Sequence, residues 1–237
     1  MKRIKLGGRS ELTEMRPMEA AIGWVYLPLH AIGMWMLMPI ILDAFNFSEA
    51  QYNLFVYAVG YVVLSFTMAN FLRTDFDVFW DNFRVSIQAI GVNIIWYYIA
   101  QYAVSLLLAS VLPTIENPNT EAVTEAAISS GRTMMFVAAV LAPIVEEILF
   151  RGVVFGTIAR KNKAVAYIVS TVLFSAYHLW IYVYLGADLL LMALYAVEYI
   201  PGSVMFAKTY DESGTIWAPI LMHMLMNYVA VSAASML

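Results

Sequence analysis

Six side chains that could carry out or support hydrolysis lie in three runs of sequence that are otherwise apolar. The six are Glu146, Glu147, Arg151, His178, His223 and Asn227. A carboxylate and an imidazole can activate a water molecule, and imidazole and amide N–H groups can stabilise an oxyanion. In a membrane helix each ionisable group costs roughly 2.5–3.5 kcal/mol to insert and needs a partner or a purpose. These residue types therefore predict a buried hydrolytic site.

The two glutamates differ in what a helix would place beside them. Glu147 and Arg151 are four residues apart, so they share one face and can form an ion pair that offsets much of their insertion cost. Glu146 points about 100° away around the helix axis. Glu146 is therefore the candidate general base, and Pro143, one turn upstream, loosens the helix because it lacks a backbone donor.

The third run presents an imidazole and an amide together. His223 and Asn227 are four residues apart, so one helix face offers two neutral hydrogen-bond donors for a developing oxyanion, or a pair of ligands. Counting along the predicted helices at about 1.5 Å per residue puts Glu146, His178 and His223 at a common depth in the cytoplasmic half. We predict that the three helices bring these groups together.

The elements that must position these groups are transmembrane helices. The chain of 237 residues is 62% hydrophobic and 13% charged, with a mean hydropathy of +0.74, whereas soluble domains are closer to half apolar and a quarter charged. Apolar runs of about 20 residues indicate helices and not the shorter alternating strands of a barrel. The predicted fold is an all-α polytopic transmembrane bundle of about seven helices. They occupy residues 21–42, 52–72, 85–111, 132–156, 164–186, 189–207 and 215–235.

Charge and cysteine content exclude several classes of function. A net charge of −4 and a pI near 5.3 give no broad basic field, which argues against a nucleic-acid partner. The absence of cysteine excludes disulfides, thiolate metal sites and cysteine nucleophiles. Positive charge in short loops stays in the cytoplasm, so the N-terminus is predicted to be cytoplasmic. That orientation places eleven of the 13 basic residues inside: Lys2, Arg3, Lys5, Arg9, Arg16, Arg73, Arg84, Arg160, Lys161, Lys163 and Lys208.

Other polar segments receive structural interpretations. Pro113–Gly131 is predicted to be an acidic outer loop, with a short interfacial helix as the alternative. Asp77–Arg84 is predicted to be an amphipathic segment at the inner interface. His30 is interpreted as a packing residue, and residues 152–156 as a close-packing motif between helices. Glu198 has no evident partner and is assigned equally to a clamp between helices or an accessory role.

The three runs resemble the signature of the CAAX protease and bacteriocin-processing (CPBP/Abi) family of intramembrane proteases, and in particular its type II CAAX prenyl endopeptidases. That signature is a Glu-Glu-x-x-x-Arg helix, a Phe-x-x-x-His helix and a His-x-x-x-Asn (or Asp) helix. The chain matches it in order with Glu146-Glu147-x-x-x-Arg151, Phe174-x-x-x-His178 and His223-x-x-x-Asn227. The resemblance covers about residues 132–230.

The resemblance implies a role for each group. Glu146 with His178 would position and deprotonate a water molecule. His223 and Asn227 would stabilise the tetrahedral oxyanion, and Arg151 would hold the acidic pair. The resemblance also divides the chain into a basic cytoplasmic tail, variable membrane helices with the outer acidic loop, and a catalytic core. Their predicted bounds are residues 1–20, 21–131 and 132–237.

The cofactor remains open at this level. The chain has no His-Glu-x-x-His helix of the zinc-protease kind. A nitrogen and oxygen site of plausible ligand number could still form for a divalent metal such as zinc. Its candidate ligands are Glu146, His178, His223 and Asn227. We favour a water molecule activated without a tightly held zinc.

Three hypotheses follow for function. The first is an intramembrane endopeptidase, in contact with membrane lipid, that hydrolyses a membrane-associated peptide or protein in the cytoplasmic membrane of a bacterium. The alternative is a non-enzymatic bacteriocin-immunity protein, or a protein that binds a regulatory membrane partner. A proton-coupled transporter that uses Glu146, Glu198 and the histidines would be expected to show internal repeats and broken helices, which the sequence does not indicate.

Overall fold

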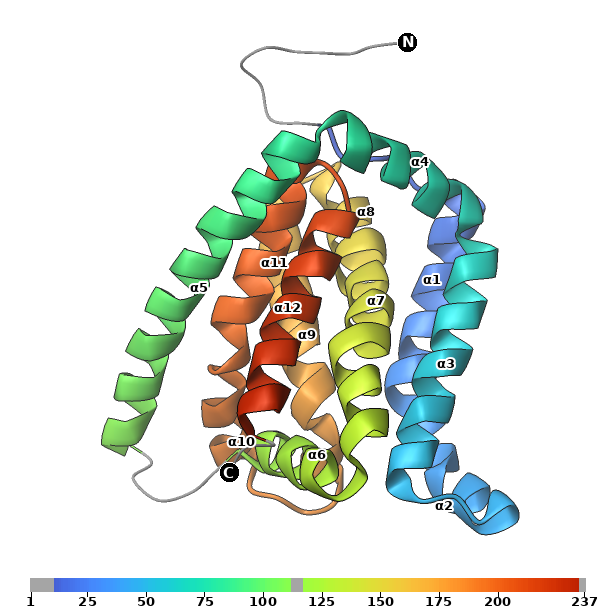
Figure 1. Cartoon of the computed structure of the whole chain (residues 1–237), viewed down its shortest axis with the longest axis vertical. Coiled ribbons are helices and arrows are strands. Elements are labelled where there is room, and N and C mark those ends of the chain that lie inside the picture. Colours follow the sequence, from blue (N-terminus) through green and yellow to red (C-terminus); the bar gives the residue numbers. More distant parts are fainter. Residues whose placement is uncertain (1–10, 112–116, 235–237) are drawn as a thin grey trace.

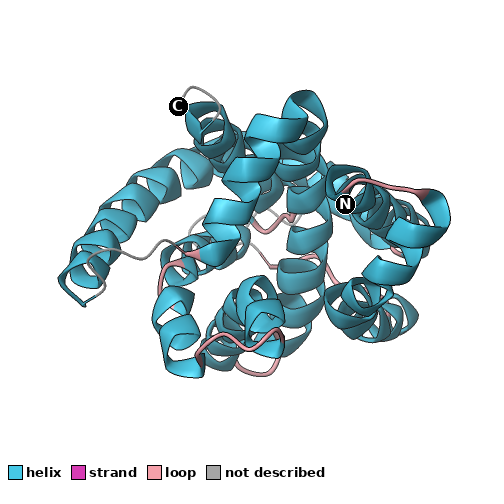
Figure 2. Ribbon diagram, turned by 90° about the horizontal axis from the view of Figure 1, so that it is seen from below, coloured by secondary structure: helices cyan, strands magenta, loops and turns pink. Residues whose placement is uncertain are grey.

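The computed structural model describes residues 11–111 and 117–234, which form a bundle of helices joined by short loops (Figures 1 and 2). Neither range contains a strand, and the predicted all-α fold is confirmed. Four of the basic residues used to predict the orientation lie outside the described residues: Lys2, Arg3, Lys5 and Arg9. The same holds for residues 112–116 of the predicted outer loop.

The chain enters the bundle through a long helical segment and the helix that returns beside it. These elements are α1 (Pro17–Pro28), the π-helical segment η1 (Leu29–Gly33), α2 (Met34–Phe45) and α3 (Glu49–Thr67). Asn46, at a φ of 51°, ends α2 in the left-handed conformation that Asn tolerates. Ser48 begins α3 through a capping box, because its side chain accepts from Gln51 N at 3.3 Å and Gln51 Oε1 accepts from Ser48 N at 2.8 Å.

α4 (Ala69–Asp81) leaves α3 at an angle of 85° and crosses one end of the bundle (Figure 1). Two buried carboxylates fix this arrangement. Glu19 Oε1 on α1 accepts from Phe71 N at 3.1 Å, in the first turn of α4. Asp75 Oδ2 accepts from Ile216 N at 2.6 Å, just before the last helix begins. Both helix starts thus receive a carboxylate from another helix, and at α4 no local side chain provides a cap.

The bend at Met68 corrects two predictions. The helix expected over residues 52–72 ends at Thr67. The amphipathic segment expected at Asp77–Arg84 begins and ends earlier in the chain, as α4. This helix buries Phe71 and Phe79 on one face. α5 (Phe83–Val111) follows almost at once and packs against α11 (Tyr199–Ser213).

The outer connection is helical and not an open loop. α6 (Pro118–Phe136) begins at Asn117, whose Oδ1 accepts from Asn119 N at 3.0 Å, with Pro118 in the first turn. The predicted loop over Pro113–Gly131 is therefore wrong from Pro118 onward, and the alternative of a helix is confirmed. The helix kinks at Gly131, whose φ of 37° suits glycine.

The remaining elements carry the three polar runs. The first run lies on a mixed helix made of η2 (Val137–Leu141), α7 (Ala142–Glu147), η3 (Ile148–Phe155) and α8 (Gly156–Ala159). The others lie on two of the helices α9 (Lys163–Tyr184), α10 (Leu189–Ala196), α11 and α12 (Trp217–Ala234). Asn162 and Asp188 cap the starts of α9 and α10, and Gly214, at a φ of 76°, ends α11.

Within the described ranges, four helices are long and apolar enough to cross a membrane. They are Pro17–Phe45, Phe83–Val111, Ile128–Ala159 and Lys163–Tyr184. The bent pairs α3 with α4, and α10 with α11, raise the total to six if each pair counts as one span. The protein is therefore an integral membrane protein with four to six candidate spans, where the sequence predicted about seven. α12 fills the seventh predicted window but is not among the candidates.

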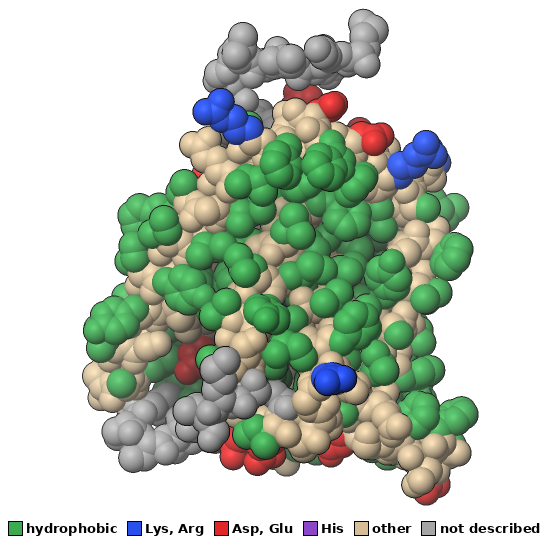
Figure 3. All heavy atoms as spheres, viewed as in Figure 1, with side chains coloured by type: hydrophobic (Ala, Val, Ile, Leu, Met, Phe, Trp, Pro, Cys, Tyr) green, Lys and Arg blue, Asp and Glu red, His purple; other side chains and the backbone are tan. Residues whose placement is uncertain are grey.

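The core lies around η3, whose eight residues are all buried. The largest hydrophobic cluster packs Val153, Val154 and Phe155 against residues of α1, α9, α11 and α12. A Cβ at Gly152 would lie 3.3 Å from Met15 Cε, which supports the close-packing interpretation of residues 152–156. Figure 3 shows hydrophobic side chains over the middle of the visible face and charged side chains toward its two ends.

Candidate active site

The polar runs meet inside the C-terminal half of the bundle. Glu146 and Glu147 end the short helix α7, which lies between the π-helical segments η2 and η3. π-Helical turns widen a helix and re-aim its side chains, and they occur frequently at functional sites. Both carboxylates are buried, with 4% of Glu146 and none of Glu147 exposed. Two adjacent acidic groups at this depth require compensation from neighbouring helices.

Glu147 pairs with Arg151, as predicted. Arg151 Nε lies 3.2 Å from Glu147 Oε2, and both side chains are fully buried. Arg151 Nη2 also donates to the carbonyl oxygen and the Oγ of Ser203, at 3.1 and 3.0 Å. The guanidinium lies over the rings of Phe174 and Phe206, with its Cζ 4.3 and 5.2 Å from the ring centroids. Arg151 therefore joins η3 to α9 and α11.

Glu147 also holds the imidazole of His223. His223 Nδ1 lies 2.8 Å from Glu147 Oε1, and the ring stacks on Phe206 with centroids 4.3 Å apart. The carboxylate is an acceptor, so Nδ1 carries the proton and donates. Glu147 therefore bridges Arg151 and His223, and it directs Nε2 of that histidine toward the other glutamate.

Glu146 faces both histidines with one oxygen. Its Oε2 lies 4.0 Å from His178 Nε2 and 3.9 Å from His223 Nε2. These separations are too long for direct hydrogen bonds and match the spacing of polar atoms that share a bridging water. The sequence prediction that the three groups come together is confirmed in geometry.

His178 is held by its own helix. Its Nδ1 lies 2.8 Å from the carbonyl oxygen of Phe174, one turn earlier on α9, so Nδ1 carries the proton and Nε2 presents a lone pair. The ring stacks on Tyr199 with centroids 4.5 Å apart. The backbone carbonyl of Phe174 thus fixes the tautomer of His178 that faces Glu146.

Asn227 departs from the predicted arrangement. Its Nδ2 donates to the carbonyl oxygen of Ala138 in η2 at 2.8 Å, so one of its two N–H groups is used in joining α12 to η2. His223 Nδ1 is likewise used by Glu147. The two residues share a helix face as expected, but only Nε2 of His223 and the second amide N–H of Asn227 remain for another acceptor.

Comparison with known proteins covers the same part of the chain. Residues 129–229 match the model of the type II CAAX prenyl endopeptidase Rce1-like family, and all six predicted site residues lie in that range. Residues 129–229 are called the Rce1-like domain below, after the family whose model they match. The chain is also 31% identical over 154 residues to the "Putative membrane peptidase YdiL" of Bacillus subtilis (strain 168). That alignment covers 61% of this chain and 57% of the relative's length. No solved structure matches the chain.

The Rce1-like domain does not contain every residue that contacts Glu146. Tyr57 on α3 donates its hydroxyl to Glu146 Oε1 at 2.9 Å, and the hydroxyl of Tyr177 lies 2.9 Å from that of Tyr57. His30, interpreted as a packing residue, is buried with its Nε2 3.4 Å from Tyr177 Oη. Nothing in the sequence marks Tyr57 as a site residue, because a single tyrosine in an apolar helix belongs to no motif.

The donors of the Rce1-like domain fit a metal only in part. Glu146, His178 and His223 converge, but Asn227 turns one N–H to Ala138. Over residues 11–111 and 117–234, no group of three or more His, Asp or Glu residues is arranged to hold a metal ion. A water molecule activated without a tightly held zinc, favoured from the sequence, stays a prediction, with a divalent metal as its alternative.

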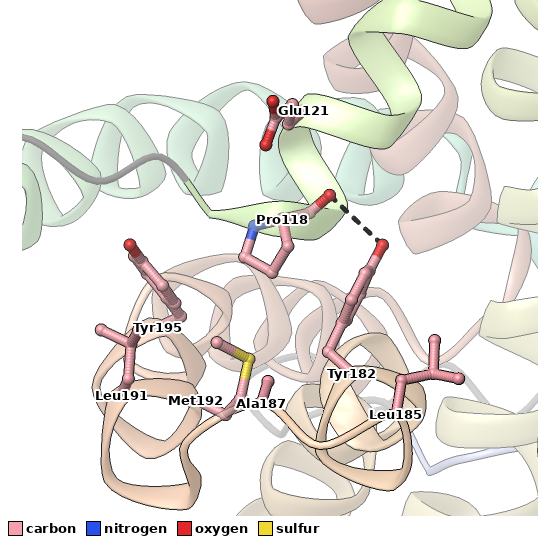
Figure 4. Close-up of a pocket in the computed structure, with 8 residues that line it drawn as sticks. All are labelled: Pro118, Glu121, Tyr182, Leu185, Ala187, Leu191, Met192 and Tyr195. Atoms are coloured by element: carbon pink, nitrogen blue, oxygen red, sulfur yellow. Dashed lines mark hydrogen bonds between the residues drawn. The ribbon is translucent and has the colours of Figure 1, made fainter.

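Glu198, left open by the sequence, has a partner. Asn117 Nδ2 donates to Glu198 Oε2 at 2.7 Å, so the carboxylate ties the start of α6 to the start of α11. This contact supports the clamp interpretation. Beside it, a pocket of about 340 Å³ opens between α6, the end of α9 and α10 (Figure 4). Tyr182, one turn beyond His178, lines this pocket and donates to the carbonyl oxygen of Pro118 at 3.2 Å.

Proposed function

We propose that the protein is an intramembrane endopeptidase that hydrolyses a peptide bond of a membrane-associated protein or peptide. One observation carries the proposal: a single oxygen of Glu146 faces Nε2 of both His178 and His223 at about 4 Å. A water molecule between these atoms would contact a base and two imidazoles together. The Rce1-like domain and the named activity of the Bacillus relative support the same class of enzyme.

In the proposed reaction the water oxygen attacks the scissile carbonyl carbon while Glu146 Oε2 takes one proton from that water. His178 Nε2 accepts the second O–H of the water and orients it. The carbonyl oxygen becomes the oxyanion, and it accepts from His223 Nε2–H and the free N–H of Asn227. Collapse of the tetrahedral intermediate breaks the C–N bond, and Glu146 returns its proton to the leaving amine.

The proposed contact with the oxyanion uses both ring nitrogens of His223. Nδ1 lies against Glu147 Oε1, and Nε2 is the atom that must donate to the oxyanion. We therefore propose glutamate-type hydrolysis, with His223 as an electrophile and not as a second base.

We place the site in the cytoplasmic half of a bacterial cytoplasmic membrane. Two contacts gather basic residues at the end of the bundle where the described chain begins: Arg160 with Glu14, and Lys163 with Asp211. By the positive-inside rule this end faces the cytoplasm. Cysteine introduced at Glu14 and labelled by an impermeant maleimide only after cell lysis would support the orientation.

The test of function uses the full chain purified in detergent. The probes are internally quenched peptides ending in a farnesylated Cys-aliphatic-aliphatic-X motif, the same peptides without farnesyl, and single-span hydrophobic segments. Glu146→Gln removes the base and keeps the side-chain shape, so we expect kcat to fall by roughly 100- to 10,000-fold. His178→Ala should cause a loss of similar order. Glu125→Gln on α6, an exposed position, is the matched control and should be neutral.

A comparison of membrane proteomes and secreted peptides from cells with the wild type and with Glu146→Gln would identify the substrate. Full cleavage by a folded Glu146→Gln protein would refute the enzymatic proposal. An unchanged cellular phenotype of Glu146→Gln, with loss through surface substitutions instead, would point to a non-enzymatic immunity or binding protein. Proton flux in sealed liposomes that depends on Glu198 would favour a transporter.

A further inference from the structure

A path of hydrogen-bonded side chains begins at Oε1 of Glu146, the oxygen that does not face the two catalytic histidines. It passes through Tyr57 on α3 and Tyr177 on α9, and it ends at His30 in η1. The separations along it are 2.9, 2.9 and 3.4 Å. Two of its members come from helices that precede the Rce1-like domain. None of them has a role in the proposed reaction.

The donors and acceptors along these hydrogen bonds can be assigned in only one order when Glu146 is ionised. An ionised Glu146 can only accept, so the single proton of the Tyr57 hydroxyl is committed to Glu146 Oε1. The oxygen of Tyr57 is then the acceptor for the hydroxyl of Tyr177. Tyr177 in turn accepts from His30, which must carry its proton on Nε2. Hydrogen bonds aligned head to tail polarise and strengthen one another, and here all of them end on the carboxylate.

Close packing of α3 against α7 brings Tyr57 to Glu146. Gly60, three residues after Tyr57, lets α3 approach α7 closely, because a Cβ there would lie 3.2 Å from both Cγ atoms of Val145. The same Cβ would lie 3.4 Å from Cε1 of His30. The imidazole of His30 stacks on Tyr177 with an interplanar angle of 20°, and its centroid lies 5.5 Å from that of Tyr57. The donors are therefore held by neighbouring rings and helices.

We propose that Tyr57 is a positioning residue for Glu146: its hydroxyl, supported by Tyr177 and His30, holds Oε1 and so presents Oε2 to the two catalytic histidines. The inference rests on the proposed hydrolytic function and deepens it. A carboxylate with one oxygen held has one orientation, and a base displaced by about 1 Å can cost roughly 100-fold in rate. The Rce1-like domain without α3 lacks this donor.

The kinetic test uses the full chain in detergent and a probe peptide that the wild type cleaves and Glu146→Gln does not. Tyr57→Phe removes only the donor, and we expect kcat to fall by roughly 10- to 100-fold with KM nearly unchanged. Tyr177→Phe leaves the bond between Tyr57 and Glu146 in place, so its loss should be smaller. Tyr61→Phe, one turn later on α3 at a side chain that is 42% exposed, is the matched control.

A second measurement needs no substrate. The infrared difference spectrum between wild type and Tyr57→Phe should contain a carboxylate stretching band, because Glu146 loses a charge-assisted hydrogen bond. The band should vanish when both proteins also carry Glu146→Gln. Thermal unfolding of each variant in detergent checks that the fold is kept.

The outcomes separate this inference from the proposed function. A folded Tyr57→Phe protein with wild-type kcat, or no carboxylate band, overturns the inference while an inactive Glu146→Gln protein leaves hydrolysis standing. A rise in KM or a loss of stability without a change in kcat also overturns it, because that result indicates a packing role. If Glu146→Gln keeps full activity the hydrolytic proposal fails, and the infrared band alone then decides whether Tyr57 holds Glu146.

Discussion

The segment Ile128–Ala159 and α5 are both apolar helices long enough to cross a membrane, yet they lie in different surroundings. In an apolar window of 18 residues, the share buried inside the protein is 67% for the first helix and 6% for the second. The first carries Glu146, Glu147 and Arg151, which lipid cannot satisfy. Apolar composition therefore identifies membrane helices. Ionisable residues within one of them indicate that the remaining helices surround it.

The same contrast separates the two halves of the chain. The Rce1-like domain holds its polar groups by many internal contacts, such as Arg151 with Glu147 and Ser203. The helices before it meet this domain through other polar contacts, among them Tyr57 with Glu146, Asn93 with Thr209 and Asp75 with Ile216. Substitutions at these different contacts should therefore differ in cost, and three experiments would break or sharpen the comparison.

The largest effect is expected inside the Rce1-like domain. Arg151→Ala leaves Glu147 buried beside Glu146 without its cation, and breaking such a pair costs about 3–5 kcal/mol of unfolding free energy. The measurement is a denaturant titration of the purified protein in mixed micelles. Arg160→Ala is the control, because Arg160 and Glu14 are 41% and 77% exposed and such a pair contributes about 0–1 kcal/mol. Equal losses for both variants would contradict the contrast.

A smaller effect is expected where α3 meets the domain. Gly60→Leu places a side chain against Val145 and His30, and overpacking of this kind costs about 1–3 kcal/mol. Gly91→Leu on α5 is the matched control, because a Cβ there has no neighbour within 4 Å. Thermal unfolding in detergent compares the two. A stable Gly60→Leu protein would show that α3 can move away from Glu146, and kcat would then report whether the site needs that contact.

Much of this arrangement follows from local sequence rules. The i, i+4 spacing of Glu147 and Arg151 predicted their ion pair, and Glu146, one residue earlier, was predicted to point elsewhere. Some apolar windows located a helix within a few residues, as at α9, predicted at 164–186 and found at Lys163–Tyr184. These features depend on neighbours in the chain, which a sequence displays directly. The window 189–207 was wrong as a single helix, because it contains α10 and most of α11.

The rest depends on partners that lie far apart in the sequence. Tyr57 and Glu146 are 89 residues apart, and nothing in α3 marks that tyrosine as a donor. At the bend after Thr67, Glu19 from another helix accepts from Phe71 N. Asn227 was expected to face the oxyanion, but the carbonyl of Ala138 accepts from it, because Ala142 N bonds to the carbonyl of Val137 and Pro143 has no N–H to offer. Such contacts follow from the packing of helices and not from their periodicity.

The smallest effect is expected at the contact between α4 and α12. Asp75→Ala removes the carboxylate that accepts from Thr215 Oγ1 and from Ile216 N, and losing a capping side chain costs about 0.5–2 kcal/mol. Asp77→Ala, at an exposed position two residues along the same helix, is the matched control and should be neutral. α12 carries His223, so the contact of Asp75 with the start of α12 also bears on where that imidazole lies relative to Glu146. Thermal unfolding measures the stability loss, and a loss of kcat in Asp75→Ala larger than its stability loss explains would show that α4 helps to align the site.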